Sequence, residues 1–377
     1  MNFELNEEQS ALADSLSRLL ADRYAFEKRR ALATSDVPHD PATWAGLAEL
    51  GVTAAPLPEA HGGFGGGARD LLPLMQAFGR ALSIEPFLPS IVLGATALRL
   101  AAGEDLQARL LPRVASGDTR LAWAHDEPDG RHAALWIETR AEHRNGRWVL
   151  EGAKSPVLGA GLAQHFVVTA RTRGAPDDTE GCALFLVDAG ASGAELRSYR
   201  LVDDSAAGEL RLHGAAAEPL GDPSEAGRAQ RAIEGTVNAG IAAVCADMAG
   251  AAQAAFDLAM DYLRTRRQFG RLIGENQALR HRAAEMLVSL EMARSMAIAA
   301  AVATDGPQAD EACLDLHRAK LSVGRHARQV AHGAIQLHGG IGMTEEYAVG
   351  HYLRRIHVLD QLFGDADAHA ARLAAPN

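Results

Sequence analysis

Apolar side chains recur at helical spacing in the first and last parts of the chain and in short β-prone runs in the middle. Three stripes in the last part follow steps of three or four residues: Ile241, Val244, Met248, Ala251, Ala255, Leu258 and Tyr262; Leu279, Ala283, Met286, Leu287 and Leu290; Leu316, Ala319, Val323, Ala327, Val330 and Ala334. Each stripe predicts a long helix with one buried face, and together they predict an antiparallel bundle. On the second helix, Met292 and Met296 are expected in the core with Met286.

The rest of the chain separates into a helical and a β-rich part. Near the start, "LADSLSRLLADRY" has its leucines at helical spacing. In the middle, "RWVLEGAKSPVLG", "HFVVTART" and "CALFLVDA" are β-prone, and Asn145-Gly146 is a hairpin signal. The pattern predicts an α+β protein with an N-terminal α-helical domain (residues 1–118), a central β-domain (119–222) and a C-terminal α-helical bundle (223–377).

Composition narrows the function classes. The 377 residues carry a formal charge of −11, which disfavours binding to nucleic acid. The three cysteines are far apart and form no CxxC pair, so neither a disulfide framework nor a zinc site is expected. The apolar region from Gly240 to Met260 contains Asp247 and Asp257 and predicts a buried helix and no membrane span. The N-terminal "MNFELNEEQ" lacks a signal-peptide layout, and we expect a cytoplasmic protein.

The segment "YLRTRRQFGRLIGENQ", Tyr262 to Gln277, concentrates positive charge in an acidic chain. We expect the first long helix to end near Gln268, Gly270 to take a left-handed turn, and the next helix to begin at an N-cap, Asn276. One or two arginines would complement a helix dipole. Four arginines in eight residues suggest instead an anionic ligand or a partner, and both explanations remain open: Arg264, Arg266, Arg267 and Arg271.

A second break, "QLHGGIGMTEEY" from Gln336 to Tyr347, has three glycines in four residues. A helix corner needs one glycine, whereas three expose backbone N–H groups that can approach an anion closely. An arginine-rich corner and a glycine-rich corner in one bundle would together suit a pyrophosphate. The earlier "HGGFGGGARD" does not lie between a strand and a helix, and it predicts a flexible turn and no phosphate loop.

The two corners resemble motifs of the acyl-CoA dehydrogenase family. The first resembles the family's Y-x-x-x-R-x-Q-F-G-x-x-I-x-x-x-Q, and the second resembles its Q-x-x-G-G-x-G-[YM]-T-x-E-Y. The C-terminal "EEYAVGHYLRRIHVLDQLFGDAD" is most similar to the small subunits of pimeloyl-CoA dehydrogenase and related bacterial two-subunit enzymes. The resemblance covers nearly the whole chain and implies the acyl-CoA dehydrogenase fold: an N-terminal α-helical domain, a central β-domain of barrel or sandwich type and a C-terminal four-helix bundle.

The resemblance implies FAD as the cofactor. The flavin ring would lie in one subunit, and the pyrophosphate and adenine would meet the two corners of a neighbouring subunit. Arg266 would then pair with pyrophosphate oxygens through a charge-assisted contact. The other implied cofactor-binding residues are Gln268, Phe269, Gln277, Gln336, Gly339 and Gly340.

The implied reaction is α,β-dehydrogenation of an acyl-CoA thioester. A carboxylate removes a proton from Cα, and the β-hydrogen leaves as hydride to the flavin. The implied partners are the acyl-CoA substrate, an electron-transfer flavoprotein as electron acceptor, and a homologous or identical chain within a tetramer. The implied role lies in fatty acid metabolism.

The chain departs from the family at the base. In many members the base is the Glu of a terminal Y-E-G-T, which falls here on "LFGD", so Phe363 occupies the Glu position. A minority place the Glu on the first long helix, at the position of Gly240. The catalytic residue is therefore unknown. The nearest substitutes are Asp360, Asp365, Glu345 and Glu346.

The motifs on the ring side of the cofactor differ as well. The family's T-E-P-x-A-G-S becomes "DEPDGRH", and its G-x-K-x-W-I-T-N becomes "GAKSPVLG", with Pro156 and Leu158 replacing Trp and Thr. If FAD bridges two chains, a chain can lose its own ring pocket and still serve its neighbour's cofactor. This favours one subunit of a hetero-oligomer. The alternatives are a self-sufficient homo-oligomer with a displaced base, a non-catalytic subunit that completes a partner's FAD site, and a related flavin oxidase or monooxygenase.

Overall fold

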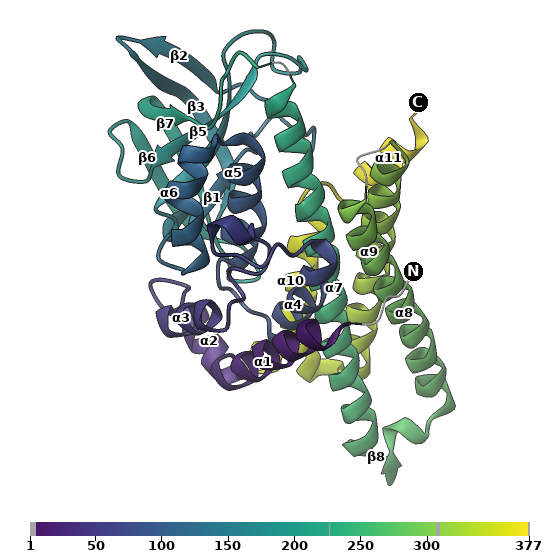
Figure 1. Cartoon of the computed structure of the whole chain (residues 1–377). Coiled ribbons are helices and arrows are strands. Elements are labelled where there is room, and N and C mark those ends of the chain that lie inside the picture. The colour runs from purple at the N-terminus through teal and green to yellow at the C-terminus, as the bar shows by residue number, and fades with distance from the viewer. Residues whose placement is uncertain (1–4, 226, 307–309, 376–377) are drawn as a thin grey trace. The chain divides into compact units, whose positions relative to one another are not determined.

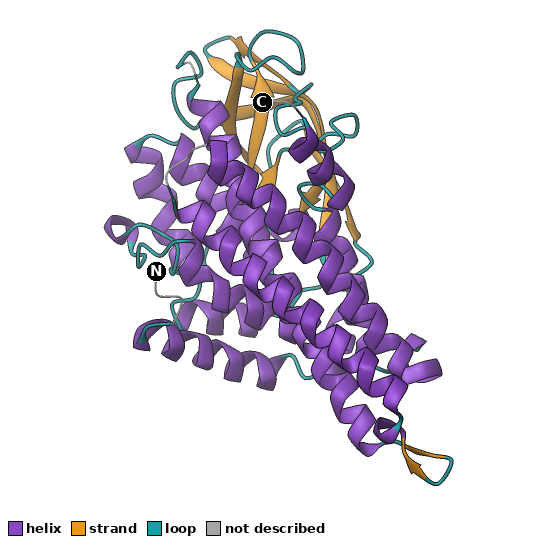
Figure 2. Ribbon diagram, turned by 90° about the vertical axis from the view of Figure 1, so that its right-hand side faces the viewer, coloured by secondary structure: helices purple, strands orange, loops and turns teal. Residues whose placement is uncertain are grey.

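The computed structural model describes residues 5–225, 227–306 and 310–375, so the first four residues of the N-terminal stretch lie outside it. Helices form both ends of the chain and strands form the middle, which confirms the predicted fold class (Figure 1). The strands gather in one region, apart from a short hairpin that projects beyond the helices (Figure 2). Two compact units are present: residues 1–31, 67–83 and 241–377 form one, and residues 32–66 and 84–240 form the other.

The unit with residues 241–377 is helical. Its elements are α1 (Glu7–Arg23), α4 (Ala68–Ala81), the larger part of α7 (Arg228–Thr265), β8 (Arg267–Gln268), β9 (Arg271–Leu272), α8 (Gln277–Asp305), α9 (Asp310–His338), α10 (Val349–Gln361) and α11 (Ala366–Ala374). The predicted stripe on α9 is buried at all six positions, and the stripe on α7 is buried from Ile241 to Ala255. These faces form the core of the bundle because their side chains are small or aliphatic and pack closely.

The predicted stripe on α8 is partly wrong. Met286 and Leu290 are buried, but Leu287 is 44% exposed and Met292, expected in the core, is 45% exposed. The helix carries apolar side chains on two opposite faces with the same spacing. The pattern therefore predicts burial for some side chains that lie on the exposed face. Of the most apolar 18-residue stretch of each helix, 83% is buried in α7 and 39% in α8. Both helices are long and apolar enough to cross a membrane by length and composition alone.

The other unit combines short helices with a sheet. Its helices are α3 (Pro41–Glu49), a π-helical turn (Leu88–Gly94), α5 (Ala95–Ala101) and α6 (Glu104–Ala115), while α2 (Phe26–Thr34) crosses the boundary between the units. The segment "HGGFGGG" is a turn, as predicted, and it is held by backbone bonds from Phe64 N to Ala54 O and from Gly65 N to Leu57 O. These bonds give the turn a defined conformation.

The sheet of this unit closes on itself. Its strands are β1 (Leu121–Ala124), β2 (Arg140–Arg144), β3 (Arg147–Leu158), β4 (His165–Arg171), β5 (Cys182–Asp188), β6 (Ala194–Arg200) and β7 (Ala206–Pro219). The order β4-β2-β3-β7-β5 returns to β4 through the β4–β5 pairing, so these strands form a ring as a barrel does. Asn145 and Gly146 both have positive φ and join β2 to β3, which confirms the predicted hairpin.

Candidate functional site

The arginine-rich corner is a hairpin at the end of α7. The helix ends at Thr265, three residues before the predicted end, and β8 and β9 pair through Arg267↔Leu272 and Gln268↔Arg271. The two-residue loop between them has positive φ at both positions, +54° at Phe269 and +80° at Gly270. A bulky residue rarely adopts this conformation, and Phe269 is also 99% exposed. Such local strain at a fully exposed aromatic side chain indicates a contact surface.

The arginines of this corner fall into two groups. Arg264 pairs with Asp261 at 3.3 Å, Arg271 donates to Asn276, and Arg280 donates to the carbonyl of Gly274 at 2.7 Å. The contacts of Arg271 and Arg280 join the hairpin to the start of α8, whereas the pair of Arg264 lies within α7. Arg266 and Arg267 are exposed and have no ion pair or side-chain hydrogen bond among the described residues. The corner therefore presents two guanidinium groups whose donors are available to an anion.

Asn276 precedes α8 as predicted, but its side chain does not cap the helix. Its Nδ2 donates to the carbonyl of Ile273 at 2.9 Å, and its Oδ1 accepts from Arg271. Both polar atoms of the Asn276 side chain bond to the hairpin. The backbone N–H groups in the first turn of α8, near Gln277, are therefore not capped by this side chain. This is the end of the helix where an anion is stabilised.

The glycine-rich corner joins α9 to α10 through a 3₁₀ turn, Gly339–Met343. Gly339 has φ +64°, and a Cβ at Gly339 or Gly340 would meet nothing within 4 Å. The backbone here is open because no side chain covers it. Gln336 is exposed one turn earlier on α9. The corner offers uncovered N–H groups beside a polar side chain, which suits phosphate oxygens.

An aromatic cluster brings the two corners together. The rings of Tyr262, one turn before Arg266, and of His338, directly before Gly339, lie 4.5 Å apart between centroids. The Nε2 of His338 lies 3.2 Å from the hydroxyl of Tyr347, beyond the glycines. The end of α7 and the end of α9 are therefore neighbours, as a shared pyrophosphate site requires. The sequence patterns gave no indication of this link because it depends on the burial of His338, which is 4% exposed.

The structure thus places the predicted cofactor-binding residues on two adjacent corners of one unit. All of them are exposed: Arg266, Gln268, Phe269, Gln277, Gln336, Gly339 and Gly340. The donor set consists of guanidinium, carboxamide and backbone N–H groups. These groups fit the phosphate and adenosine end of a dinucleotide, and they supply no group that exchanges protons or electrons.

The position of the family's glutamate lies in a turn between α10 and α11. Phe363 occupies it with φ +62°, and Gly364 follows with φ +105°. The ammonium of Lys320 on α9, 0% exposed, donates to the carbonyls of Asp360 at 2.7 Å and Gly364 at 2.9 Å. Burial lowers the pKa of Lys320. This contact fixes both ends of the turn that contains Phe363.

The four substitute carboxylates lie in different surroundings. Asp360 is 0% exposed, between Lys320 at 3.8 Å and Arg328 at 3.5 Å. Asp365 caps α11 by accepting from the N–H groups of Asp367 and Ala368. The pKa of Glu345 is lowered by a hydrogen bond from Arg354, and Glu346 is exposed to water. A general base needs both access to the substrate and partial desolvation, so the ion pairs of Asp360 and the exposure of Glu346 both bear on that role.

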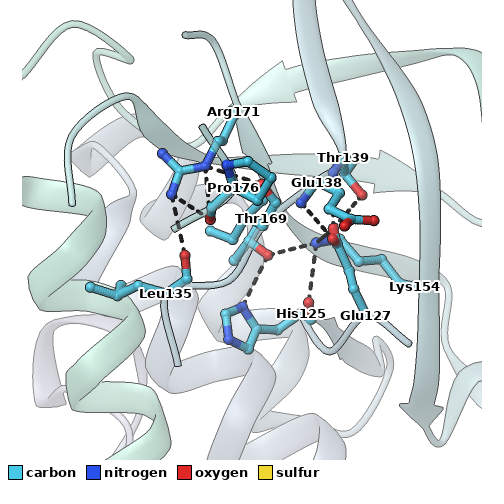
Figure 3. Close-up of polar contacts among 10 residues, drawn as sticks. His125, Glu127, Leu135, Glu138, Thr139, Lys154, Thr169, Arg171 and Pro176 are labelled. Carbon is cyan, nitrogen blue, oxygen red and sulfur yellow. Dashed lines mark hydrogen bonds and ion pairs between the residues drawn. The ribbon is translucent and has the colours of Figure 1, made fainter. Parts of the chain in front are cut away.

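A buried polar cluster lies within the β-sheet unit (Figure 3). The ammonium of Lys154 on β3 donates to Glu127 Oε1 at 2.6 Å, to Thr169 Oγ1 at 3.0 Å and to the carbonyl of His125 at 3.1 Å. All three of its donors are used. The carboxylate of Glu127 in turn accepts from the N–H and hydroxyl of Thr139. This closed network explains structurally why a lysine is buried at position 154.

The cluster also fixes the state of His125. Thr169 Oγ1 accepts from Lys154 and lies 3.0 Å from Nδ1 of His125. Burial and the Lys154 ammonium lower the pKa of His125 to about 3, so the ring is neutral.

A second buried cation, Arg171, donates to the carbonyls of Leu135, Ile137 and Pro176 (Figure 3). Lys154 and Arg171 therefore pin the segment that contains "DEPDGRH".

Comparison with known proteins gives matches along nearly the whole chain. Three protein-family models match: acyl-CoA dehydrogenase, N-terminal domain, over residues 6–118; the middle domain over 122–214; and the C-terminal domain over 230–375. A protein named probable acyl-CoA dehydrogenase YngJ of Bacillus subtilis (strain 168) is 28% identical over 383 residues, which cover 99% of this chain and 98% of YngJ.

Two solved structures of similar fold have names that join two chains. A variant of the Tcur3481-Tcur3483 steroid ACAD is 30% identical with a TM-score of 0.87, covering 97% of this chain and 96% of the other. A chain of the ChsE4-ChsE5 complex from Mycobacterium tuberculosis is 24% identical with a TM-score of 0.88 and full coverage of both chains, which shows the shared fold.

Proposed function

The chain belongs to the acyl-CoA dehydrogenase family, and from that premise we propose that it is one subunit of a two-chain, FAD-dependent acyl-CoA dehydrogenase. The family's enzymes are FAD flavoproteins. In the proposal, this chain holds the pyrophosphate and adenosine of an FAD whose ring lies in a sister chain, defined here as a homologous subunit that carries the catalytic glutamate.

One observation carries the proposal. The exposed arginine corner and glycine corner are joined through Tyr262 and His338, whereas the position of the glutamate in the same chain holds Phe363. The two corners carry groups that suit a dinucleotide, and in the proposal the group that takes the Cα proton comes from the sister chain. A chain of this kind would bind part of the cofactor, and another chain would supply the catalytic group of the same active site.

Each residue of the two corners has a specific task in this arrangement. Arg266 would form the charge-assisted contact to the pyrophosphate, and the open backbone at Gly339 and Gly340 would approach its oxygens. Phe269 offers a flat apolar face to the adenine, and Gln277 offers a carboxamide. Bound FAD supplies a hydride acceptor for the β-hydrogen of the substrate. The contribution of this chain is to orient that cofactor and to shield it from water.

Paired-chain relatives support a hetero-oligomer over a self-sufficient enzyme. The solved structure that is 30% identical is the Tcur3481-Tcur3483 steroid ACAD, a paired name, and a second is a ChsE4-ChsE5 complex. Because the former is described as a steroid ACAD, a bulky polycyclic acyl-CoA is the first substrate class to test here. The resemblance to pimeloyl-CoA dehydrogenase subunits makes a dicarboxylyl-CoA the second.

The experiment compares this chain alone, its sister chain alone and the two co-purified. We expect this chain alone to be unable to bleach FAD with any acyl-CoA under anaerobic conditions, and the co-purified pair to bleach it on addition of a steroid or dicarboxylyl acyl-CoA. Anaerobic bleaching by this chain alone would contradict the proposal. Oxygen consumption matching each turnover would identify an oxidase instead.

A matched variant tests whether the position of Phe363 is the missing part of an otherwise complete site. Phe363→Glu restores a carboxylate at the family position, in the turn fixed by Lys320. Because the proposal places the flavin ring in the sister chain, we expect the variant alone to remain unable to bleach FAD. Acyl-CoA-dependent bleaching by the variant would show a complete site within this chain and would favour the self-sufficient homo-oligomer.

A further inference from the structure

We propose that Cys313 on α9 is a reactive thiol and a modification site, whose thiolate attacks low-molecular-weight disulfides and forms a mixed disulfide with them. The sulfur is held by His317 on the same helix and by Arg372 on α11. Gln336 of the glycine-rich corner lies about 35 Å further along the axis of α9, at about 1.5 Å per residue. The inference is therefore independent of the proposed function.

Three side chains form a connected row from the surface into the helical unit. Sγ of Cys313, an exposed residue, lies 3.7 Å from Nε2 of His317. Nδ1 of His317 lies 2.9 Å from Nδ1 of His369 on α11, and the centroids of the two rings are 5.0 Å apart. His369 is 0% exposed, and its helix lies beside α9 in Figure 1. The buried ring therefore fixes the orientation of the outer one.

Helical spacing explains why these groups meet. Cys313 and His317 are four residues apart on α9 and so lie on the same side of that helix. His369 and Arg372 are three residues apart on α11, which also places them on a common side. The N-cap of α11, Asp365, accepts from two backbone N–H groups and fixes the start of the helix. Two neighbouring helix faces thus supply a thiol, two imidazoles and a guanidinium.

Both imidazole rings are neutral at pH 7. Burial and the Arg372 guanidinium lower the pKa of His317 to about 4. Burial and the Lys320 ammonium lower the pKa of His369 to about 3. The hydrogen bond between the two Nδ1 atoms uses a single proton, and when His369 supplies it, the proton of His317 is on Nε2. Nε2 then donates toward the sulfur of Cys313, which suits a thiolate because a thiolate only accepts.

A cation lies near the same sulfur. Burial lowers the pKa of the Arg372 guanidinium, and Cys313 acts in the opposite direction, as a negative sulfur near a positive group does. An N–H donor and a guanidinium together stabilise the thiolate, which is the nucleophilic form of cysteine. The same guanidinium disfavours a metal ion at the sulfur. In the described part of the chain, no group of three or more His, Cys, Asp or Glu side chains could hold one.

The other two cysteines lie in the opposite kind of surroundings. Cys182 and Cys245 are buried, and burial raises the pKa of both thiols, that of Cys245 to about 12. Buried thiols of this kind are inert. None of the three cysteines, all of them within the described residues, forms a disulfide. The chain therefore offers one accessible thiol and two internal controls.

The reaction needs only the disulfide as co-reactant. Ionised Cys313 attacks one sulfur of the disulfide, a new S–S bond forms, and the original S–S bond breaks. The other half of the disulfide leaves as a thiolate and takes a proton from water, which replaces the proton that Cys313 released to water. Cys313 is oxidised, and the leaving half of the disulfide is reduced to a thiol.

The test measures the second-order rate constant for modification of each cysteine of the full chain by bis(2-hydroxyethyl) disulfide at pH 7, followed by peptide mass spectrometry. The probe is uncharged, so the net charge of the chain does not affect its approach. We expect Cys313 to react at least about fivefold faster than N-acetylcysteine amide, and Cys182 and Cys245 to stay unmodified. A rate for Cys313 below that margin overturns the proposal.

Two variants test the groups that hold the sulfur. His317→Phe keeps a ring without a donor, and Arg372→Met keeps an unbranched side chain without the charge. Each should slow the modification of Cys313 by about threefold or more. Arg318→Met is the matched control, because Arg318 is exposed on α9 and pairs with Asp315 at 2.6 Å. Its rate should be unchanged.

The internal controls separate loss of structure from loss of the thiolate. A variant that unfolds exposes Cys182 and Cys245, so their modification reports unfolding. His317→Gln is the conservative variant that keeps an N–H donor, and it should retain most of the rate that His317→Phe loses. A rate for Cys313 that is unchanged in His317→Phe or in Arg372→Met overturns the assignment. Protection of Cys313 by micromolar Zn²⁺ that His317→Phe abolishes would assign the pair to a metal ion instead.

Discussion

At the scale of single residues, Arg264 and Arg266 differ in what their guanidinium groups contact. Arg264 pairs with Asp261 on its own helix, and Arg266 is exposed beside the open glycine corner. We expect Arg266→Ala to weaken FAD binding by the two-chain complex by about 1.5–3 kcal/mol, the loss of a hydrogen bond to a charged group. Arg264→Ala is the matched control. Equal FAD dissociation constants for the two variants, measured by flavin fluorescence, would remove Arg266 from the site.

His125 predicts a pH dependence of stability. Its pKa is about 3 in the folded chain and about 6.5 when unfolded, so unfolding takes up a proton between these values. The stabilisation is complete above pH 6.5 and is lost as pH falls toward the folded pKa. Between pH 7 and pH 5 this residue alone should lower the free energy of unfolding by about 2 kcal/mol. His125→Gln removes the titration, and urea unfolding at both pH values should show a smaller loss for the variant. Parallel losses would contradict a neutral buried imidazole.

Some residues of the candidate site and of the buried clusters could be predicted from the sequence and others could not, for physical reasons. Arg266 and Gly339 could be predicted as exposed cofactor-binding candidates because the proposed anion site depends on residue type and local spacing. Lys154 and Glu127 pair only because strand register brings β3 beside the start of the "DEPDGRH" segment, and nothing local encodes that. The burial of His338 depends likewise on Tyr262 of another helix.

At the scale of elements, Lys320 connects α9 to the end of α10 and the start of α11. Its ammonium satisfies two buried carbonyls and lies near the buried Asp360. Lys320→Met keeps the volume but leaves these groups uncompensated, and we expect about 3 kcal/mol of lost stability. Arg318→Met, on the exposed side of α9 and paired with Asp315, should change stability by no more than about 0.5 kcal/mol.

Hydrogen exchange distinguishes a local from a general effect of Lys320→Met. We expect the amides around Phe363 and Gly364 to exchange faster in the variant than those of α7, because the turn loses the contact that fixes it. If the two variants lose equal stability by urea unfolding, or if exchange at the turn is unchanged, Lys320 does not hold the turn.

Helices and strands were predictable where one face is buried. The stripe on α9 was correct at every position because α9 is packed on a single apolar side. The stripe on α8 failed at Leu287 because a second apolar face has the same periodicity as the first. That failure is informative: pattern alone cannot tell a face covered by the same chain from one covered by another.

At the scale of the whole molecule, the chain combines two adjacent exposed corners, which we propose bind a dinucleotide, with Phe363 at the position where the sequence predicts the family's glutamate. The fold and the family were predictable from the sequence because two motifs lie at the right order and separation in a helix–β–helix pattern. The family resemblance predicts a cofactor shared between two chains, but the residues of the second polypeptide cannot be predicted, since no local pattern in this chain records them.

The most direct test of that sharing is the FAD content of the complex between this chain and its sister chain, isolated by gel filtration and measured from flavin absorbance after denaturation. The account predicts one FAD for every two chains, because this chain contributes the residues that bind the pyrophosphate and the sister chain contributes the pocket for the flavin ring. One FAD for every chain would contradict it.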